Sequence, residues 1–451
     1  MAANTAPLKD QADLLRRGLA DLRAEDPELA SLLDAEVFRQ HNTLSLVSSS
    51  STVKPSTLVA CASVLVNVTA EGMPGKRHRP GCEQVDRVEA LAIRRARELF
   101  DAHYASVQSH SASNAIAQVL SALLEPGDTL LGMAHDHGGD LTLGSPAVFT
   151  GAYYKAIRYG TTPEGLIDYE QVRSLALAHR PRIILCGASA YSRVVDFERL
   201  RAIADEAGAI LLADISHIAG LVATGRHPNP INAAHVTVTC THKQLGGPRG
   251  GLILSGREAD TKVPGLRSTF SRVLDQAVFP RMQGAPAVNL IAAKAAALGY
   301  AKSAEFDACM GRVRTLADEM AHGFQTHGYE VVGGRSENHT VLIRLSGAMT
   351  GAIAEAALER CGIVVSKRSV PGEMRPAAVT SGLCMGSGSM AQRRIDRDGC
   401  RQVVELVCLV LDSVTPLGEQ DYHLEPAVRE QLRAEVQALC ARYPIADYLE
   451  G

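Results

Sequence analysis

The stretch AILLADISH (residues 209–217) is followed by HVTVTCTHKQLGGPRGG (residues 235–251), and the two together decide the fold of the chain. Each begins with a short apolar run that is typical of a buried strand in a parallel sheet. Asp214 lies at the end of the first run and Lys243 just after the second. Open α/β sheets bind ligands at the carboxyl ends of their strands, so this pair marks a candidate site.

Around this pair, helices and apolar strands alternate from about residue 88 to residue 255. VEALAIRRARELF (88–100) and NAIAQVLSALL (114–124) have helical periodicity. DTLLGM (128–133), RIILCGAS (182–189) and GGLIL (250–254) are short, apolar and bounded by turn or polar residues, as strands are. The alternation predicts an α/β fold with a mostly parallel sheet.

The two ends of the chain differ from this middle part. The first forty residues predict one or two amphipathic helices, which we expect to form an arm that packs on a partner subunit. The run SLVSSSSTVKPS (45–56) fits a flexible linker, although its neighbours decide that point. Beyond about residue 300, helices and a few strands indicate a smaller α+β domain. We therefore predict an N-terminal helical arm over 1–60, a large cofactor-binding α/β domain over 61–300 and a small C-terminal domain over 301–451.

The composition is that of an ordinary globular protein. The chain has 451 residues, of which 46% are hydrophobic and 21% charged, and its formal net charge is -3. This balance argues against a nucleic-acid or anionic-membrane partner, and no apolar stretch is long enough to span a bilayer. The ten cysteines are scattered without a CxxC pair, which predicts no metal site. We expect a reduced, cytoplasmic protein.

Asp214 and Lys243 suggest a site for pyridoxal 5'-phosphate (PLP). An Asp there would pair with the protonated pyridine nitrogen and keep the ring an electron sink, and a Lys would form the imine that a substrate amine displaces. Taken alone, the spacing fits equally a capping Asp and a surface Lys, which are commoner.

Several long segments of the chain resemble serine hydroxymethyltransferases, over roughly residues 40 to 445. The segments are AEGMPGKR (70–77), GCEQVDRVEALAIRRARELF (81–100), LLEPGDTLLGM (123–133), HGGDLTLGSP (137–146), GASAYSRVVDFERLRAIADEAGA (187–209), DISHIAGLVATGRHPNP (214–230), THKQLGGPRGGLIL (241–254) and CARYP (440–444). The resemblance implies a PLP-dependent, aminotransferase-like fold of type I, with a mostly parallel sheet in the large domain and a smaller α+β C-terminal domain.

Matched residue by residue, the resemblance implies four catalytic residues. Lys243 becomes the Schiff-base lysine, Asp214 the partner of the pyridinium and His137 the histidine that stacks over the ring. Glu71 becomes the group that handles the proton of the substrate hydroxyl or of folate. The further cofactor contacts that it implies are Ser111, Ala112 and Ser113 at the phosphate, where a helix begins, Ser189 and His217 near the ring hydroxyl, and Thr241 and His242 beside the lysine.

The chain departs from the family pattern where the substrate is expected. The arginine that binds the substrate carboxylate corresponds to Cys384, which cannot form a bidentate ion pair. The other changed positions are implied to face substrate, folate or the phosphate of a neighbouring subunit, and they are Ser49, Thr69, Arg79, Arg281 and Arg368. We interpret these changes as a remodelled pocket in which one of the three arginines supplies a new cation. That these arginines are merely solvated is an equally open interpretation.

The activity implied is a PLP-dependent reaction that makes or breaks a Cα–Cβ bond of an amino acid or amine, by hydroxymethyl transfer in one-carbon metabolism or by an aldol or transaldol reaction. Tetrahydrofolate is the implied acceptor, and an aldehyde is the alternative. Decarboxylation, transamination or elimination on a substrate without an α-carboxylate stays open, as does a non-catalytic PLP-binding relative. Because Arg281 and the arm fall where the family builds its site across two chains, we expect a homodimer, or a tetramer, with a shared active site.

Overall fold

The computed structural model of the chain describes residues 10–448. Its largest element is a seven-stranded sheet with the order β4-β10-β9-β8-β7-β5-β6. The strands are β4 (Tyr104–Ser106), β5 (Thr129–Met133), β6 (Lys155–Tyr159), β7 (Ile183–Cys186), β8 (Ile210–Asp214), β9 (Val236–Cys240) and β10 (Gly251–Ser255). Every neighbouring pair is parallel except the two pairs that β10 makes, so the mostly parallel sheet predicted from the sequence is confirmed.

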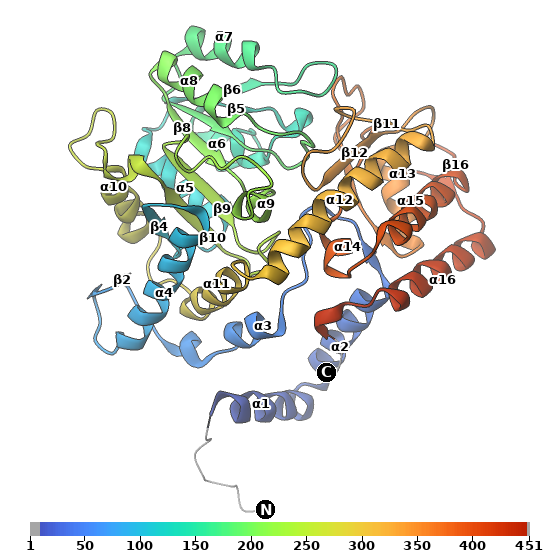
Figure 1. The fold of residues 1–451 in the computed structure, drawn as a ribbon, viewed down its shortest axis with the longest axis horizontal. Helices are drawn as coiled ribbons and strands as arrows, with labels where there is room; N and C mark the ends of the chain where they lie inside the picture. Colours follow the sequence, from blue (N-terminus) through green and yellow to red (C-terminus); the bar gives the residue numbers. More distant parts are fainter. Residues whose placement is uncertain (1–9, 449–451) are drawn as a thin grey trace, which may run out of the picture.

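Helices pack around this sheet (Figure 1). They are α4 (Glu83–Phe100), α5 (Ala112–Leu123), α6 (Phe149–Tyr153), α7 (Tyr169–His179), α8 (Phe197–Ala207), α9 (Ala219–Ala223), α10 (Phe270–Gln276) and α11 (Val288–Tyr300). All residues of β7, β9 and β10 are buried, which explains why these strands read as continuous apolar runs rather than as alternating ones. Within residues 10–448, no helix is both long and apolar enough to cross a membrane.

A second, four-stranded antiparallel sheet forms in the C-terminal part of the chain, coloured orange to red in Figure 1. Its order is β11 (Glu330–Val331), β12 (Thr340–Arg344), β15 (Gly382–Gly386) and β14 (Ser366–Arg368). The accompanying elements are α12 (Ala304–Thr326), α13 (Gly351–Arg360), α14 (Gly388–Gln392), α15 (Arg397–Asp412), α16 (Pro426–Arg442), and the short pair β16 (Thr415–Pro416) and β17 (Tyr422–His423). This part is α+β, as predicted. The exact domain boundaries stay a prediction.

The N-terminal helices α1 (Gln11–Glu25) and α2 (Pro27–Asn42) extend from one side of the molecule (Figure 1). Ala30 is the one residue of the two helices that is buried. The chain continues through β1 (Leu44–Ser45), α3 (Pro55–Cys61) and the hairpin of β2 (Gly72–Met73) and β3 (Lys76–Arg77). The predicted arm (1–60) is helical over α1, α2 and most of α3 but not over residues 43–54, and its first nine residues lie outside the described ones.

The serine-rich run is hydrogen-bonded to distant parts of the chain near its start and in its middle, so the flexible-linker interpretation is wrong. β1 pairs in parallel with β13 (Ile363–Val364), and the Gly386 amide donates a hydrogen bond to the Leu46 carbonyl at 2.7 Å. The Gln392 side chain accepts from the Thr52 amide at 2.8 Å and donates to Ser51 Oγ at 3.0 Å. We call residues 44–52 the serine strap, because these bonds tie the arm to the C-terminal part.

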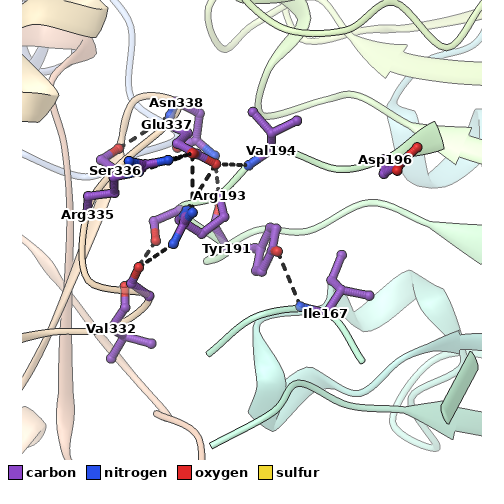
Figure 2. Close-up of polar contacts among 12 residues, drawn as sticks. Ile167, Tyr191, Arg193, Val194, Asp196, Val332, Arg335, Ser336, Glu337 and Asn338 are labelled. Carbon is purple, nitrogen blue, oxygen red and sulfur yellow. Dashed lines mark hydrogen bonds and ion pairs between the residues drawn. The ribbon is translucent and has the colours of Figure 1, made fainter. Parts of the chain in front are cut away.

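A polar junction centred on Glu337 joins segment 191–194, in the large sheet domain, to segment 332–338 (Figure 2). Arg193 Nε lies 3.0 Å from Glu337 Oε2, and the Val194 amide donates to the same oxygen at 2.9 Å. Asn338 Nδ2 donates to the Tyr191 carbonyl at 2.8 Å. Burial alone would raise the pKa of Glu337, but the hydrogen bonds from Arg193, Val194 and Arg335 hold it at about 2. The two parts of the chain are therefore joined by an ionised carboxylate.

Candidate active site

A cavity of about 660 Å³ opens at the carboxyl ends of β8 and β9, where the parallel strands were expected to hold a ligand. Ten of the residues implicated from the sequence line it: Ser49, Ser111, Ala112, Ser113, Ser189, Asp214, His217, His242, Lys243 and Arg368. Seven others are not part of this lining: Thr69, Glu71, Arg79, His137, Thr241, Arg281 and Cys384. The fold thus brings residues from five separate regions of the chain around Lys243.

Asp214 ends β8 as a partly buried carboxyl group. Ser216 donates to Asp214 Oδ1 twice, from its amide at 2.9 Å and from its hydroxyl at 2.5 Å. Burial raises the pKa of Asp214, and Asp140 adds to the rise, while the Ser216 bonds and the charge of Lys243 oppose it. Both bonds reach Oδ1, so Oδ2 is the oxygen left for a donor in the cavity.

The first turn of α5 forms another part of the cavity wall. Ser111 caps this helix by accepting from the Asn114 amide at 3.0 Å, and it lines the cavity with Ala112 and Ser113. The first amides of a helix have no partner within it, and the helix dipole adds partial positive charge, so an anion is favoured there.

The buried Lys294 binds backbone carbonyls next to the first turn of α5. Lys294 of α11 is 2% exposed, and its ammonium donates to the carbonyls of Val107, Ser109 and Gly251 at 2.6, 2.8 and 3.1 Å. Burial lowers its pKa to about 7, and the nearby Glu89 charge opposes that fall. Sequence reasoning missed Lys294, because a single Lys in a helical segment is ordinarily on the surface.

The histidines of the cavity are held neutral. His217 packs on His339 with their ring centroids 5.9 Å apart, and burial, followed by the charge of Lys243, keeps the pKa of His217 well below its ordinary value. Its Nδ1 is buried without a hydrogen-bond partner among the described residues. Burial and the charge of Arg249 lower the pKa of His242 to about 4.

His137 does not line the cavity in this structure, and its stacking role stays a prediction. Its Nδ1 accepts from the Thr161 amide at 3.0 Å, and its ring lies close against Gly160. Asp140, three residues further on, lines the cavity instead. Asp140 Oδ1 accepts from the amide and the hydroxyl of Thr142 at 3.0 and 2.6 Å, which fixes the carboxylate in place.

Thr241 and Cys384 do not line the cavity either. The Thr241 hydroxyl donates to the Pro248 carbonyl at 2.6 Å and thereby closes the glycine-rich turn after Lys243. Cys384, on β15, is 1% exposed, and its sulfur lies 3.9 Å from Ser48 Oγ. Both residues support the site in this structure and do not line it.

The remaining implicated residues lie near the β2–β3 hairpin and the segment that follows α10. Arg79 Nε lies 3.5 Å from Glu71 Oε2, and the Arg79 side chain is 61% exposed. Arg281 donates to the Ser121 carbonyl at 2.6 Å. Thr69 is exposed. Within one chain, Glu71 is thus not a neighbour of Lys243 in the cavity.

The cavity fits PLP group by group. It offers a lysine amine, a partly buried carboxylate with one oxygen left for a ring nitrogen, a helix start for a phosphate, and a His217 nitrogen without a partner among the described residues for a ring hydroxyl. A mostly parallel sheet that holds such a set at its strand ends defines a PLP-dependent enzyme of fold type I.

Comparison with known proteins narrows this class. The family model described as serine hydroxymethyltransferase matches residues 22–407, and the chain belongs to the serine hydroxymethyltransferase family. A serine hydroxymethyltransferase of Marinobacter nauticus is 44% identical over 422 residues, which cover 93% of this chain and 97% of that protein. One from a Cyanothece species is 43% identical, covering 97% and 98%, and one from Alkalilimnicola ehrlichii is 44% identical, covering 94% and 97%.

Proposed function

We propose that this enzyme transfers a hydroxymethyl or related one-carbon or aldehyde unit to and from the α-carbon of a small amino acid, with serine and glycine as the first candidates. The observation that carries the proposal is that Lys243, Asp214 and the first residues of α5 line one cavity, in which burial raises the pKa of Asp214. Bound PLP would supply an electron sink for the carbanion that forms when a Cα–Cβ bond breaks.

Different residues of the cavity would bind different groups of the cofactor. Lys243 Nζ would hold the cofactor until the amine of the substrate replaces it. Asp214 Oδ2 would keep a proton on the ring nitrogen, and the amides of Ala112 and Ser113 would bind the phosphate. Ser189 and His217 would bind the ring hydroxyl. His242 lines the cavity next to Lys243 and would contact the cofactor from that side.

We assign to Asp140 the place beside the cofactor that the sequence gave to His137. Asp140 lines the cavity and adds to the raised pKa of Asp214, whereas the His137 ring is bound to Thr161. Within the same short motif the catalytic candidate therefore moves by three residues, from an imidazole to a carboxylate.

The active site that we propose is shared between two copies of the chain. Glu71, Arg79 and Arg281 lie outside the cavity of their own chain, and Glu71 and Arg79 are within reach of solvent. The arm exposes a series of large apolar side chains, namely Leu29, Leu32, Leu33, Val37 and Phe38. A homodimer would cover this surface and bring Glu71 of the partner chain to the substrate, where it would handle the proton of the β-hydroxyl.

Tetrahydrofolate or an aldehyde serves as the acceptor in this proposal, and the test below separates the two. We also propose a cytoplasmic location, which is supported by the ten free cysteines.

The test starts from purified holoenzyme and from Lys243→Ala. The wild type should hold PLP with a visible absorption band that changes on adding glycine or L-serine, and Lys243→Ala should lose that response. Product analysis with β-hydroxy amino acids, with and without tetrahydrofolate, should find glycine plus formaldehyde units or the matching aldehyde. Release of carbon dioxide or of a keto acid as the main product would contradict Cα–Cβ chemistry.

A further inference from the structure

Arg368 is a cation at the cavity wall that lacks an acidic partner. It is the last residue of β14 and lines the same cavity as Lys243. Its Nε is buried without a hydrogen-bond partner, and within residues 10–448 no Asp or Glu forms an ion pair with it. Because Arg368 lines the cavity and no carboxylate of the described residues neutralises it, its guanidinium is suited to an anion that enters the cavity.

The pairing of β14 with β15 sets where Arg368 points. Arg368 is opposite Gly382 and Ser366 is opposite Cys384 in this antiparallel pair. Side chains alternate between the faces of a strand, so Arg368 and Cys384 lie on one face of the sheet. Burial raises the pKa of the Cys384 thiol, and the positive charge of Arg368 opposes that rise, as expected for near neighbours.

The other arginines near the site are less suited to bind an anion in the cavity. Arg79 is paired with Glu71, and Arg281 donates to a backbone carbonyl, and neither lines the cavity. Arg249 does line it, but its side chain lies against His242 Nε2 at 3.2 Å and the residue is exposed. Arg368 thus combines a place in the lining with an unused, buried donor.

We propose that Arg368 binds the carboxylate of an amino-acid substrate, from the strand next to the one that carries Cys384. This inference rests on the proposed function, because the substrate amine must meet the cofactor at Lys243. The serine strap supplies Ser49, Ser50 and Ser51 to the same lining, and their hydroxyls offer further donors to the carboxylate oxygens. The substrate class is therefore an α-amino acid and not a simple amine.

The test compares each amino acid with the amine that lacks its carboxylate. Holoenzyme is titrated with L-serine and ethanolamine, and with glycine and methylamine, with the visible absorbance of bound PLP as the readout. The wild type should bind the amino acid of each pair more tightly. Arg368→Gln should weaken the amino acids by about 10- to 100-fold and leave the amines nearly unchanged, and Arg368→Lys should lose less than Arg368→Gln.

Lys367→Gln is the matched control, because Lys367 is the preceding residue on β14, lies on the other face and pairs with Glu355. This control should keep the wild-type preference, and all variants should keep their PLP content. Equal loss for amino acids and amines, or a preference unchanged by Arg368→Gln, would overturn the inference. Product analysis reports separately on the proposed function, since carboxylate selectivity does not depend on which bond is then broken.

Discussion

At the scale of single residues, Asp140 is the position where a change should report most directly on the cofactor. Asp140→Asn removes a carboxylate charge from the cavity, so it should shift the absorption band of bound PLP and lower turnover by about 10-fold or more. His137→Asn should alter neither, because the His137 ring contacts Thr161 outside the cavity. Spectra and steady-state rates of the two variants decide the point. A larger effect from His137→Asn would restore the stacking role to that residue.

Lys243 and Asp214 were predictable because parallel strands end at one edge of a sheet, and the ends of β8 and β9 must then be neighbours. That Asp140 lines the cavity was not predictable from the sequence. It lies in the irregular segment after β5, where no helix or strand period tells which side chain turns inward. The direction of Arg368 required the register of β14 with β15, which a sequence without its partner strand does not contain.

At the scale of elements, the start of α5 depends on a lysine from another helix. Lys294→Met keeps the bulk of the side chain but leaves the carbonyls of Val107, Ser109 and Gly251 without their donor. We expect a loss of about 2–4 kcal/mol of unfolding free energy, because buried acceptors without a donor are costly.

Lys294→Met should also weaken PLP binding, because Ser109 lies just before the first turn of α5, where we propose that the phosphate binds. Denaturant unfolding and PLP equilibrium dialysis measure the two effects. The control is Lys302→Met, on the surface ion pair with Glu98, which should change both by little. A Lys294→Met protein with wild-type stability would show that water replaces the ammonium.

Most helices and strands were predictable at this scale, because their apolar periods are long and regular. The serine strap was not, because its composition is that of a linker. What holds it is backbone and side-chain bonding to Gly386 and Gln392, more than 300 residues away in the sequence. Composition describes a segment's own tendencies, and contacts this distant override them.

At the scale of the whole molecule, the Glu337 junction should make the free energy of unfolding depend on pH in the acidic range. The folded-state pKa of Glu337 is about 2, below its ordinary 4.5, so its contribution is present above pH 4.5 and is lost as the pH falls from there towards 2. The contribution is at most about 3 kcal/mol. Glu337→Gln should lack it, so the difference in unfolding free energy between wild type and variant should shrink over that pH range. A difference that is constant with pH would mean that the junction is not held by the ionised carboxylate.

The arm should control assembly. Phe38 is 68% exposed on α2, and Phe38→Asp should shift the solution mass measured by light scattering from two or more chains towards one. Leu417, which is 69% exposed outside the arm, provides the control Leu417→Asp, and this variant should assemble like the wild type. An unchanged mass for Phe38→Asp would place the subunit contact elsewhere.

The serine strap also sets an order of events during synthesis. Residues 49–51 line the cavity, yet their neighbours in the strap are bonded to Gly386 and Gln392, which leave the ribosome near the end of translation. A nascent chain that already contains Lys243 and Asp214 therefore still lacks one wall of the cavity. The complete cofactor site therefore forms only late in translation or after release. Ribosome-bound chains that end before residue 386 should hold PLP more weakly than the released protein.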